Sequence, residues 1–331
     1  MAAESKSGHR LQSIEMGHAK RVQHGVALLL FLLVVFGIAA TFSLSALNQN
    51  AFRLEQESRT EQALNLAKEA LIGDAVASAI PGRLRCPESI SIANPIEGQA
   101  QGSCTTAASR IGRFPWKTLR LDTLRDGTGE PLWYALSPGF SAAPINSNTL
   151  GQLQVDGRPN AAVAVIVAPG VPLSGQSRTA VTPANPPQVS QYLDLTNSGG
   201  SSFVSSGPAG TINDRFVIIT QAELFKAVNT RVLAELRGLD DQAPNLPVRG
   251  LRNFHNLYGT FPWADNDGDG FADANIATGR LPFNELSLDA WLTTNNWLPL
   301  VSYTRISANS AQLSIGTSIM KAVPCPALPC P

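Results

Sequence analysis

The chain has 331 residues, and its 25 Lys and Arg residues balance its 25 Asp and Glu residues. This balance provides no strong global field that would point to nucleic acid or to an acidic partner. Only 15% of the residues are charged, whereas Gly (27) and Pro (23) are plentiful, which favours a loop-rich, β-containing exported domain over a helical cytosolic enzyme.

The N-terminal part of the chain is dominated by an apolar stretch at residues 26–47, which contains no charged side chain. A helix over these residues would be ~33 Å long, enough to cross a hydrocarbon core of ~30 Å. We therefore predict a transmembrane helix. Lys20 and Arg21 precede it, and basic residues at this position hold the N-terminus in the cytoplasm. A cleaved secretory signal and an ordinary single-span anchor are the alternatives.

The helix is expected to continue in amphipathic form to about residue 79, where Pro81 and Gly82 end it. Its apolar residues are spaced three or four apart and form one stripe, which would form the spine of a head domain. The residues of this stripe are Leu54, Ala63, Leu66, Ala67, Ala70, Leu71 and Ala75.

The boundary at Gly25 carries a resemblance to a known family. A polar, basic leader ends in Gly25, and an uninterrupted apolar helix begins at Val26 and becomes amphipathic. This pattern resembles the signal of type IV pilin-like proteins, the family of pilins and type II secretion pseudopilins. The resemblance implies that prepilin peptidase cleaves between Gly25 and Val26 and that the new N-terminus is methylated. It also implies that the mature helix packs in the core of a pilus-like fibre.

The residue at position 30 indicates which kind of subunit the chain resembles. Major subunits of the family carry glutamate at the fifth mature residue, which is Leu30 here. Some minor subunits, notably the large one placed at the fibre tip, also lack that glutamate. The resemblance therefore implies a minor subunit whose partners are other pilin or pseudopilin subunits and prepilin peptidase. It further implies a single-pass protein of the bacterial inner membrane, with a cytoplasmic N-terminus and a periplasmic head, that enters a pilus or pseudopilus fibre.

The predicted fold class is α+β, with a long N-terminal transmembrane and amphipathic helix and a loop-rich, β-containing globular head. We assign residues 1–25 to a cytoplasmic leader, 26–79 to the assembly helix and 80–331 to the exported head. The predicted function is that of a minor structural subunit of a type IV pilus or type II secretion pseudopilus. The alternative is a periplasmic binding or interaction protein held by a single span in the inner membrane.

Within the head, apolar runs predict strands, and a capping box predicts a helix. Thr220 and Glu223 form the capping-box pattern in front of an amphipathic helix at 221–238. The expected strands are 131–136, 161–168, 215–220, 298–303 and 312–319. The sequence of residues 112–116 (GRFPW) resembles that of residues 259–263 (GTFPW). The head is therefore predicted to contain two related halves, about 80–214 and 215–331, with chance recurrence of aromatic residues as the alternative.

All four cysteines, Cys86, Cys104, Cys325 and Cys330, lie after the apolar segment. Their even number favours disulfides in an oxidising compartment, and three pairings are possible. A zinc site is the alternative. Neither pair has CxxC spacing and no histidine lies nearby, so disulfides are preferred.

Residues 265–273 follow the start of an EF-hand loop, in which alternating short carboxylates converge on one ion. The expected ligands are the side chains of Asp265, Asp267, Asp269 and Asp273 and the backbone carbonyl of Phe271. Position 12 is Ile276, so the usual bidentate glutamate is absent, and Glu285 comes late. We predict a single structural Ca²⁺ completed by water or another loop. The alternative is a solvated Asp/Gly turn without metal.

Catalysis is not predicted, because His255 is the only histidine after the leader and it lies beside aromatic residues. The sequence contains no GxSxG, no P-loop and no GxGxxG after a strand. A small basic and aromatic patch, Arg113, Lys117 and Arg120 around Phe114 and Trp116, is too thin to predict a nucleic-acid partner.

Overall fold

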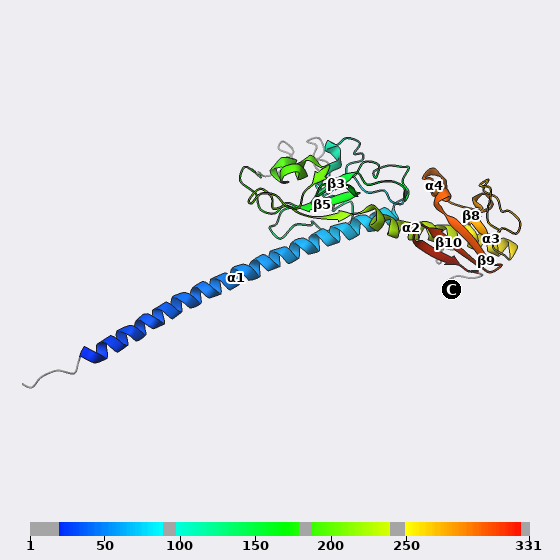
Figure 1. Cartoon of the computed structure of the whole chain (residues 1–331). Helices are drawn as coiled ribbons and strands as arrows, with labels where there is room; N and C mark the ends of the chain where they lie inside the picture. Colours follow the sequence, from blue (N-terminus) through cyan, green and yellow to red (C-terminus); the bar gives the residue numbers. More distant parts are fainter. Residues whose placement is uncertain (1–19, 89–96, 179–186, 239–248, 326–331) are drawn as a thin grey trace, which may run out of the picture. The chain divides into compact units, whose positions relative to one another are not determined.

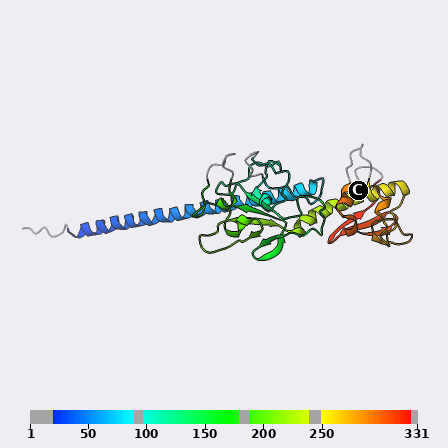
Figure 2. The same cartoon turned by 90° about the horizontal axis from the view of Figure 1, so that it is seen from above.

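A computed structural model describes residues 20–88, 97–178, 187–238 and 249–325. The side chains of residues 20–27 and 37–49 also lie outside this description. The chain divides into two compact units, residues 1–55 and 56–331. Figures 1 and 2 give two views of the elements, coloured along the chain.

The first helix, α1 (Lys20–Ala77), runs through the end of the first unit and into the second. It begins six residues before the predicted start at 26 and ends two residues before the predicted end at 79. Its end is fixed by Gly82, whose positive φ of 94° lets its N–H donate to the carbonyl of Ala75. The buried stripe is Thr60, Ala63, Leu64, Ala67, Leu71 and Ala75. Leu54 and Leu66 of the predicted stripe are instead 66% and 45% exposed.

Within the described part of the chain, no helix is long and apolar enough to cross a membrane. The fold class predicted from the sequence is therefore wrong in its transmembrane helix. What the structure has is α+β content with three sheets whose strands are mostly antiparallel.

A four-stranded antiparallel sheet lies at the centre of the first part of the head. Its strands, in spatial order, are β1 (Ile111–Arg113), β2 (Trp133–Leu136), β5 (Ala164–Ala168) and β7 (Arg215–Ile219). One face, with Tyr134 and Ile166, shares a core with the stripe of α1. The other face, with Trp133 and Val167, packs with a smaller sheet of β4 (Arg158–Ala162), β3 (Leu153–Val155) and β6 (Ser202–Phe203). Because β5 is covered on both faces, all five of its residues are apolar and buried, which explains the continuous run at 161–168.

The second part of the head repeats the order of a helix followed by an antiparallel meander. Helix α2 (Gln221–Arg237) packs against a sheet whose strands run β8 (Thr278–Arg280), β9 (Ser302–Ser307), β10 (Ser310–Ile315) and β11 (Ser318–Ala322) (Figure 1). Two short helices, α3 (Gly250–Tyr258) and α4 (Ala290–Thr294), lie between α2 and β9. Phe225 of α2 contacts both Phe140 and Trp297, so the two parts share one core.

Two polar contacts fasten α1 to α2. Thr220 caps α2 by accepting the N–H of Glu223, as the capping-box pattern predicts, but the carboxylate of Glu223 pairs with Lys68 of α1 at 2.7 Å. Arg231 donates to the carbonyls of Val76 and Ser78 and lies over the ring of Trp291. Arg231 therefore satisfies carbonyls that the end of α1 leaves without helical partners.

The predicted strands at 131–136 and 215–220 are confirmed as β2 and β7. The predicted strand at 161–168 is divided between the end of β4 and β5, and the last two predicted strands are misplaced. Leu298–Leu300 form a 3-10 turn that includes Pro299, and β9 begins only at Ser302. The predicted strand at 312–319 crosses a hairpin, because Gly316 has a positive φ of 56° and reverses the chain between β10 and β11.

Candidate functional site

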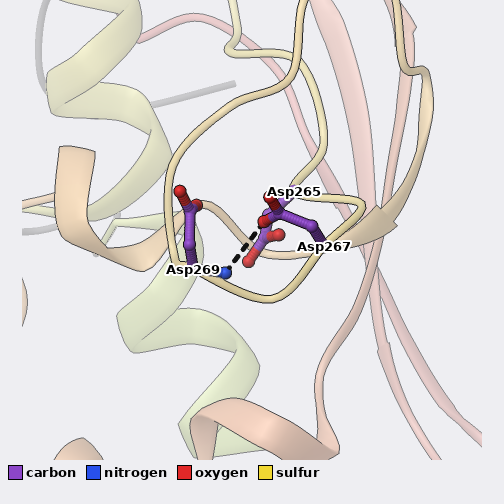
Figure 3. Close-up of side chains that lie close together, drawn as sticks. All are labelled: Asp265, Asp267 and Asp269. Atoms are coloured by element: carbon purple, nitrogen blue, oxygen red, sulfur yellow. Dashed lines mark hydrogen bonds between the residues drawn. The ribbon is translucent and has the colours of Figure 1, made fainter.

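The acidic loop lies between β8 and the segment that follows α3. Asp265 forms an isolated antiparallel bridge with Arg280, which fixes the two ends of the loop side by side. The carboxylates of Asp265, Asp267 and Asp269 converge, and one oxygen of each lies within 4.8 Å of the others (Figure 3). Asp265 is fully buried, whereas Asp267 and Asp269 are exposed.

Backbone N–H groups organise these carboxylates. The two oxygens of Asp265 accept from Gly268 and Gly270, at 2.5 and 2.9 Å. Asp267 accepts the N–H of Asp269 at 3.1 Å, the bond drawn in Figure 3. Asp269 in turn accepts the N–H of Phe271 at 2.8 Å. These bonds hold the side chains on the inner side of the turn.

Gly270 stands at the sixth position of the loop for a steric reason. Its φ is 86°, in the left-handed region, and a Cβ there would lie 2.5 Å from the amide nitrogen of Asn284. Asn284 also donates to the carbonyl of Asp269 at 2.8 Å. A side chain at position 270 would therefore both strain the turn and push away the segment that closes it.

Glu285 lies beside the loop in the structure. It was not among the expected ligands because it comes late in the sequence. The 3-10 turn Phe283–Glu285 returns the chain, and the carboxylate of Glu285 accepts the N–H of Ala272 at 2.9 Å. Asp273 lies at the other side of the loop, where it accepts the N–H of Asn266 at 2.7 Å. Ile276, at the position of the usual glutamate, packs against the hydrophobic core. A distant Glu could be recognised from the sequence only if the return of the chain after β8 were known.

The donor set of this loop suits a hard cation. Ca²⁺ takes 6–8 oxygen ligands in a flexible arrangement, and short carboxylates on a tight turn are its usual partners. The structure gathers three carboxylates. Two more, those of Asp273 in the loop and Glu285 in the adjoining 3-10 turn, accept N–H groups of the loop backbone. The residues present therefore fit a calcium ion. The side chain of Phe271, whose backbone carbonyl was the fifth predicted ligand, is half exposed.

A second candidate surface is the apolar part of α1. The side chains of residues 28–36 are all exposed, from 45% at Val35 to 70% at Phe36, and Leu30 is 57% exposed. Nine consecutive residues turn through about two and a half helical turns, so these side chains surround the helix. The backbone of Gly25 and Val26 also belongs to α1, but their surroundings lie outside the described residues.

The remaining predicted site residues are placed as follows. Cys86 and Cys104 form a disulfide, which also removes them from any zinc site. Cys325 is disulfide-bonded, and Cys330 lies outside the described residues. His255 contacts the ring of Phe261 and bonds Asn309 at 2.9 Å.

The small basic patch is not assembled as the sequence indicated. Phe114 is buried against Tyr134, and Arg113 pairs with Glu88 at 2.8 Å. Its guanidinium is therefore already neutralised by a neighbouring carboxylate.

Comparison with known proteins gives no relative: no protein-family model, no curated protein and no solved structure matches the chain.

Proposed function

We propose that the chain is a minor structural subunit of a pilus-like fibre, in which α1 is the assembly helix. Prepilin peptidase removes residues 1–25, and the mature chain then associates with related subunits through α1. The proposal rests on the resemblance of the leader and of the sequence after Gly25 to type IV pilin-like proteins. One structural observation supports it, namely the exposed apolar surface of α1 at residues 28–36.

Exposure around the full circumference of α1 favours a bundle of helices as the partner. A helix that is apolar on one face can be covered by one groove, but a helix that is apolar all round needs cover from every side. The exposed side chains at 28–36 leave no polar face that could remain in water. Neighbouring copies of the same kind of helix, packed around α1, provide such cover.

The absence of glutamate at position 30 makes the subunit a minor one. In the related fibres this glutamate pairs with the N-terminus of a neighbouring subunit. Leu30 cannot make that pair, so the subunit joins the fibre through apolar packing alone.

The processing step is tested by co-expressing the chain with prepilin peptidase and following its electrophoretic mobility. The wild-type chain should shift to the mobility expected for loss of residues 1–25, and Gly25→Leu should abolish the shift. Gly73→Ala is the matched control, because it lies in the same helix and a Cβ there would meet nothing within 4 Å. A wild-type chain that shows no peptidase-dependent shift would sink the proposal.

We also propose that the loop at 265–273 holds one structural Ca²⁺. The converging carboxylates of Asp265, Asp267 and Asp269 support it, together with the presence of Glu285 at the loop. The ion would offset the repulsion between these carboxylates and tie the loop to β8 and to the 3-10 turn Phe283–Glu285. The role of the ion is to stiffen the head, and it takes no part in a reaction.

A further inference from the structure

Two buried aspartates, Asp194 and Asp214, interlock where the chain enters β7. Asp194 is only 4% exposed, and Asp214 is 5% exposed. Each accepts from the backbone of the other: Asp214 accepts the N–H of Asp194 at 2.8 Å, and Asp194 accepts the N–H of Asp214 at 3.2 Å. The two carboxyl groups therefore lie side by side in a site removed from water.

Three of the four carboxyl oxygens have donors. In Asp194, Oδ1 accepts from Gln176 at 2.8 Å, and Oδ2 also accepts the N–H of Asn213 at 2.8 Å. In Asp214, Oδ2 also accepts from the amide of Asn197 at 2.9 Å. The remaining oxygen, Oδ1 of Asp214, is buried and has no hydrogen-bond partner. An ionised carboxylate with such an oxygen is costly, because burial removes water without replacing it.

The charged groups around the pair do not relieve this cost. Arg178 of the preceding loop lies 3.3 Å from Glu130 and stacks on Tyr192, and Arg215 of β7 pairs with Glu57 of α1 at 3.0 Å. Glu61 of α1 faces the same cavity as Asp214 and adds negative charge. The charge that acts most directly on Asp214 is that of Asp194, and it is of the same sign.

We propose that Asp194 and Asp214 share a single proton and form a pH-sensitive latch that fastens residues 195–213 to the start of β7. A proton on Oδ1 of Asp214 supplies the one missing hydrogen bond, by donation to the neighbouring carboxylate. A bound cation fits less well, because N–H donors already occupy three of the four oxygens and Ca²⁺ needs 6–8 oxygen ligands. This inference does not depend on the proposed function in a fibre.

Burial raises the pKa of Asp214 to about 7, and the neighbouring Asp194 contributes in the same direction. Below this pH Asp214 carries the proton, and the latch is closed. Above it Asp214 is ionised, and its repulsion with Asp194 acts on a site that holds one oxygen without a donor. Ionisation therefore opens the latch.

The latch controls the placement of β6 and one wall of a cavity. Asn197 bonds the backbone of Val204 in both directions, at 2.7 and 3.2 Å, which connects the latch to the end of β6. Ser205 follows, and with Asp214 and Leu64 it lines a cavity of about 330 Å³ between α1 and β7. Release of residues 195–213 would loosen the sheet of β4, β3 and β6 and widen this cavity.

Hydrogen–deuterium exchange of the full-length chain, read by mass spectrometry and corrected for intrinsic rates, tests the latch. Protection of residues 195–213 should fall about tenfold or more as the pH rises from about 5.5 to 8.5, with a midpoint near 7. Asp214→Asn should keep the protection at high pH, because its amide donates where the protonated acid does. Asp156→Asn is the matched control: Asp156 also anchors this segment, through Ser205, but it is exposed, and its variant should keep the wild-type midpoint.

Three results would overturn the proposal. The first is constant protection of the wild-type segment across this pH range, and the second is an unchanged midpoint in Asp214→Asn. The third is restoration of protection at pH about 8.5 by added Ca²⁺, which would mean that the pair holds an ion in place of a proton. If Asp214→Asn fails to fold, ¹³C NMR of the wild-type aspartate carboxyl groups decides the matter. One of them must titrate near pH 7, and titration of all of them below about 5 contradicts the latch.

Discussion

At the scale of single residues, the properties of a buried carboxylate depend on how many of its oxygens receive a hydrogen bond. Asp214 and Asp265 are both buried carboxylates, but Asp265 has an N–H donor for each oxygen, whereas Asp214 leaves one oxygen without a donor. Burial raises the pKa of Asp214. The difference in hydrogen bonding between the two sites comes from the groups that surround each carboxylate. A sequence contains both residues as the same letter, so this difference could not be predicted from it.

The raised pKa of Asp214 makes the stability of the head depend on pH. The folded chain binds a proton up to pH about 7, whereas the unfolded carboxyl releases it near 3.8. The folded state therefore holds more protons between these values, and the free energy of unfolding falls as the pH rises through this interval. The fall amounts to at most about 4 kcal/mol and levels off above pH about 7.

Urea unfolding at a series of pH values measures this effect as the difference between wild type and Asp214→Asn. As the pH rises from about 4 to 7, the free energy of unfolding of the variant should increase relative to that of the wild type. Asp156→Asn, in which an exposed carboxylate is removed, should show a small difference that does not follow this course. A constant difference between wild type and Asp214→Asn across the range would contradict the account of the pair.

At the scale of elements, the acidic loop and the apolar part of α1 offer opposite kinds of surface. The loop is preorganised by its own backbone, and spacing alone predicted that its aspartates converge, whereas the approach of Glu285 was not predicted. The helix offers side chains without cover, and its amphipathic half is anchored by Lys68 and Arg231. Both surfaces can be tested by adding or removing charged residues.

Removal of carboxylates from the loop tests calcium binding. The full-length chain should melt several degrees lower in EGTA than in millimolar Ca²⁺, because an ion that binds only the folded state stabilises it. Asp267→Ala with Asp269→Ala should make the melting temperature insensitive to chelator. Exposed Asp156→Ala, outside the loop, should keep the sensitivity. An identical melting curve of the wild type with and without chelator would show that the loop is an Asp/Gly turn without metal.

A charge on the apolar surface of α1 tests its role in assembly. Phe36→Glu should reduce recovery of the chain with its partner subunits by about tenfold or more, because burial of an unpaired carboxylate costs several kcal/mol. Asn65→Glu adds the same charge to an exposed position of α1 in the head and should leave recovery unchanged. Equal recovery of Phe36→Glu and wild type, measured by co-purification, would contradict assembly through this surface.

At the scale of the whole molecule, the sequence predicted elements better than their connections. The runs at 131–136, 161–168 and 215–220 contain β2, β5 and β7 of the central sheet, and the run at 161–168 also includes the end of β4. The last two strands differ from their predicted positions because Pro299 lies in a 3-10 turn and Gly316 reverses the chain. At these positions local backbone constraints outweigh the apolar pattern. The insertion of β3, β4 and β6 on one face of the first sheet depends on contacts between distant residues, which no local pattern encodes.

The transmembrane helix is the largest error. Hydropathy over residues 26–47 predicted a span, whereas no helix in the described part of the chain is long and apolar enough to cross a membrane. The recurrence of GRFPW and GTFPW falls in two parts of the head that each contain a helix followed by a four-stranded antiparallel sheet, and the relation between the two parts stays a prediction. In each part the central aromatic residue, Phe114 or Phe261, is buried.

The intact mass of the chain isolated from cells that contain prepilin peptidase tests the central proposal most directly. The account predicts a mass that lacks residues 1–25, carries one methyl group on Val26 and shows every cysteine oxidised. In Gly25→Leu the mass should be that of the full chain. A wild-type chain that keeps residues 1–25 and an unmodified N-terminus in the presence of active peptidase would contradict the account.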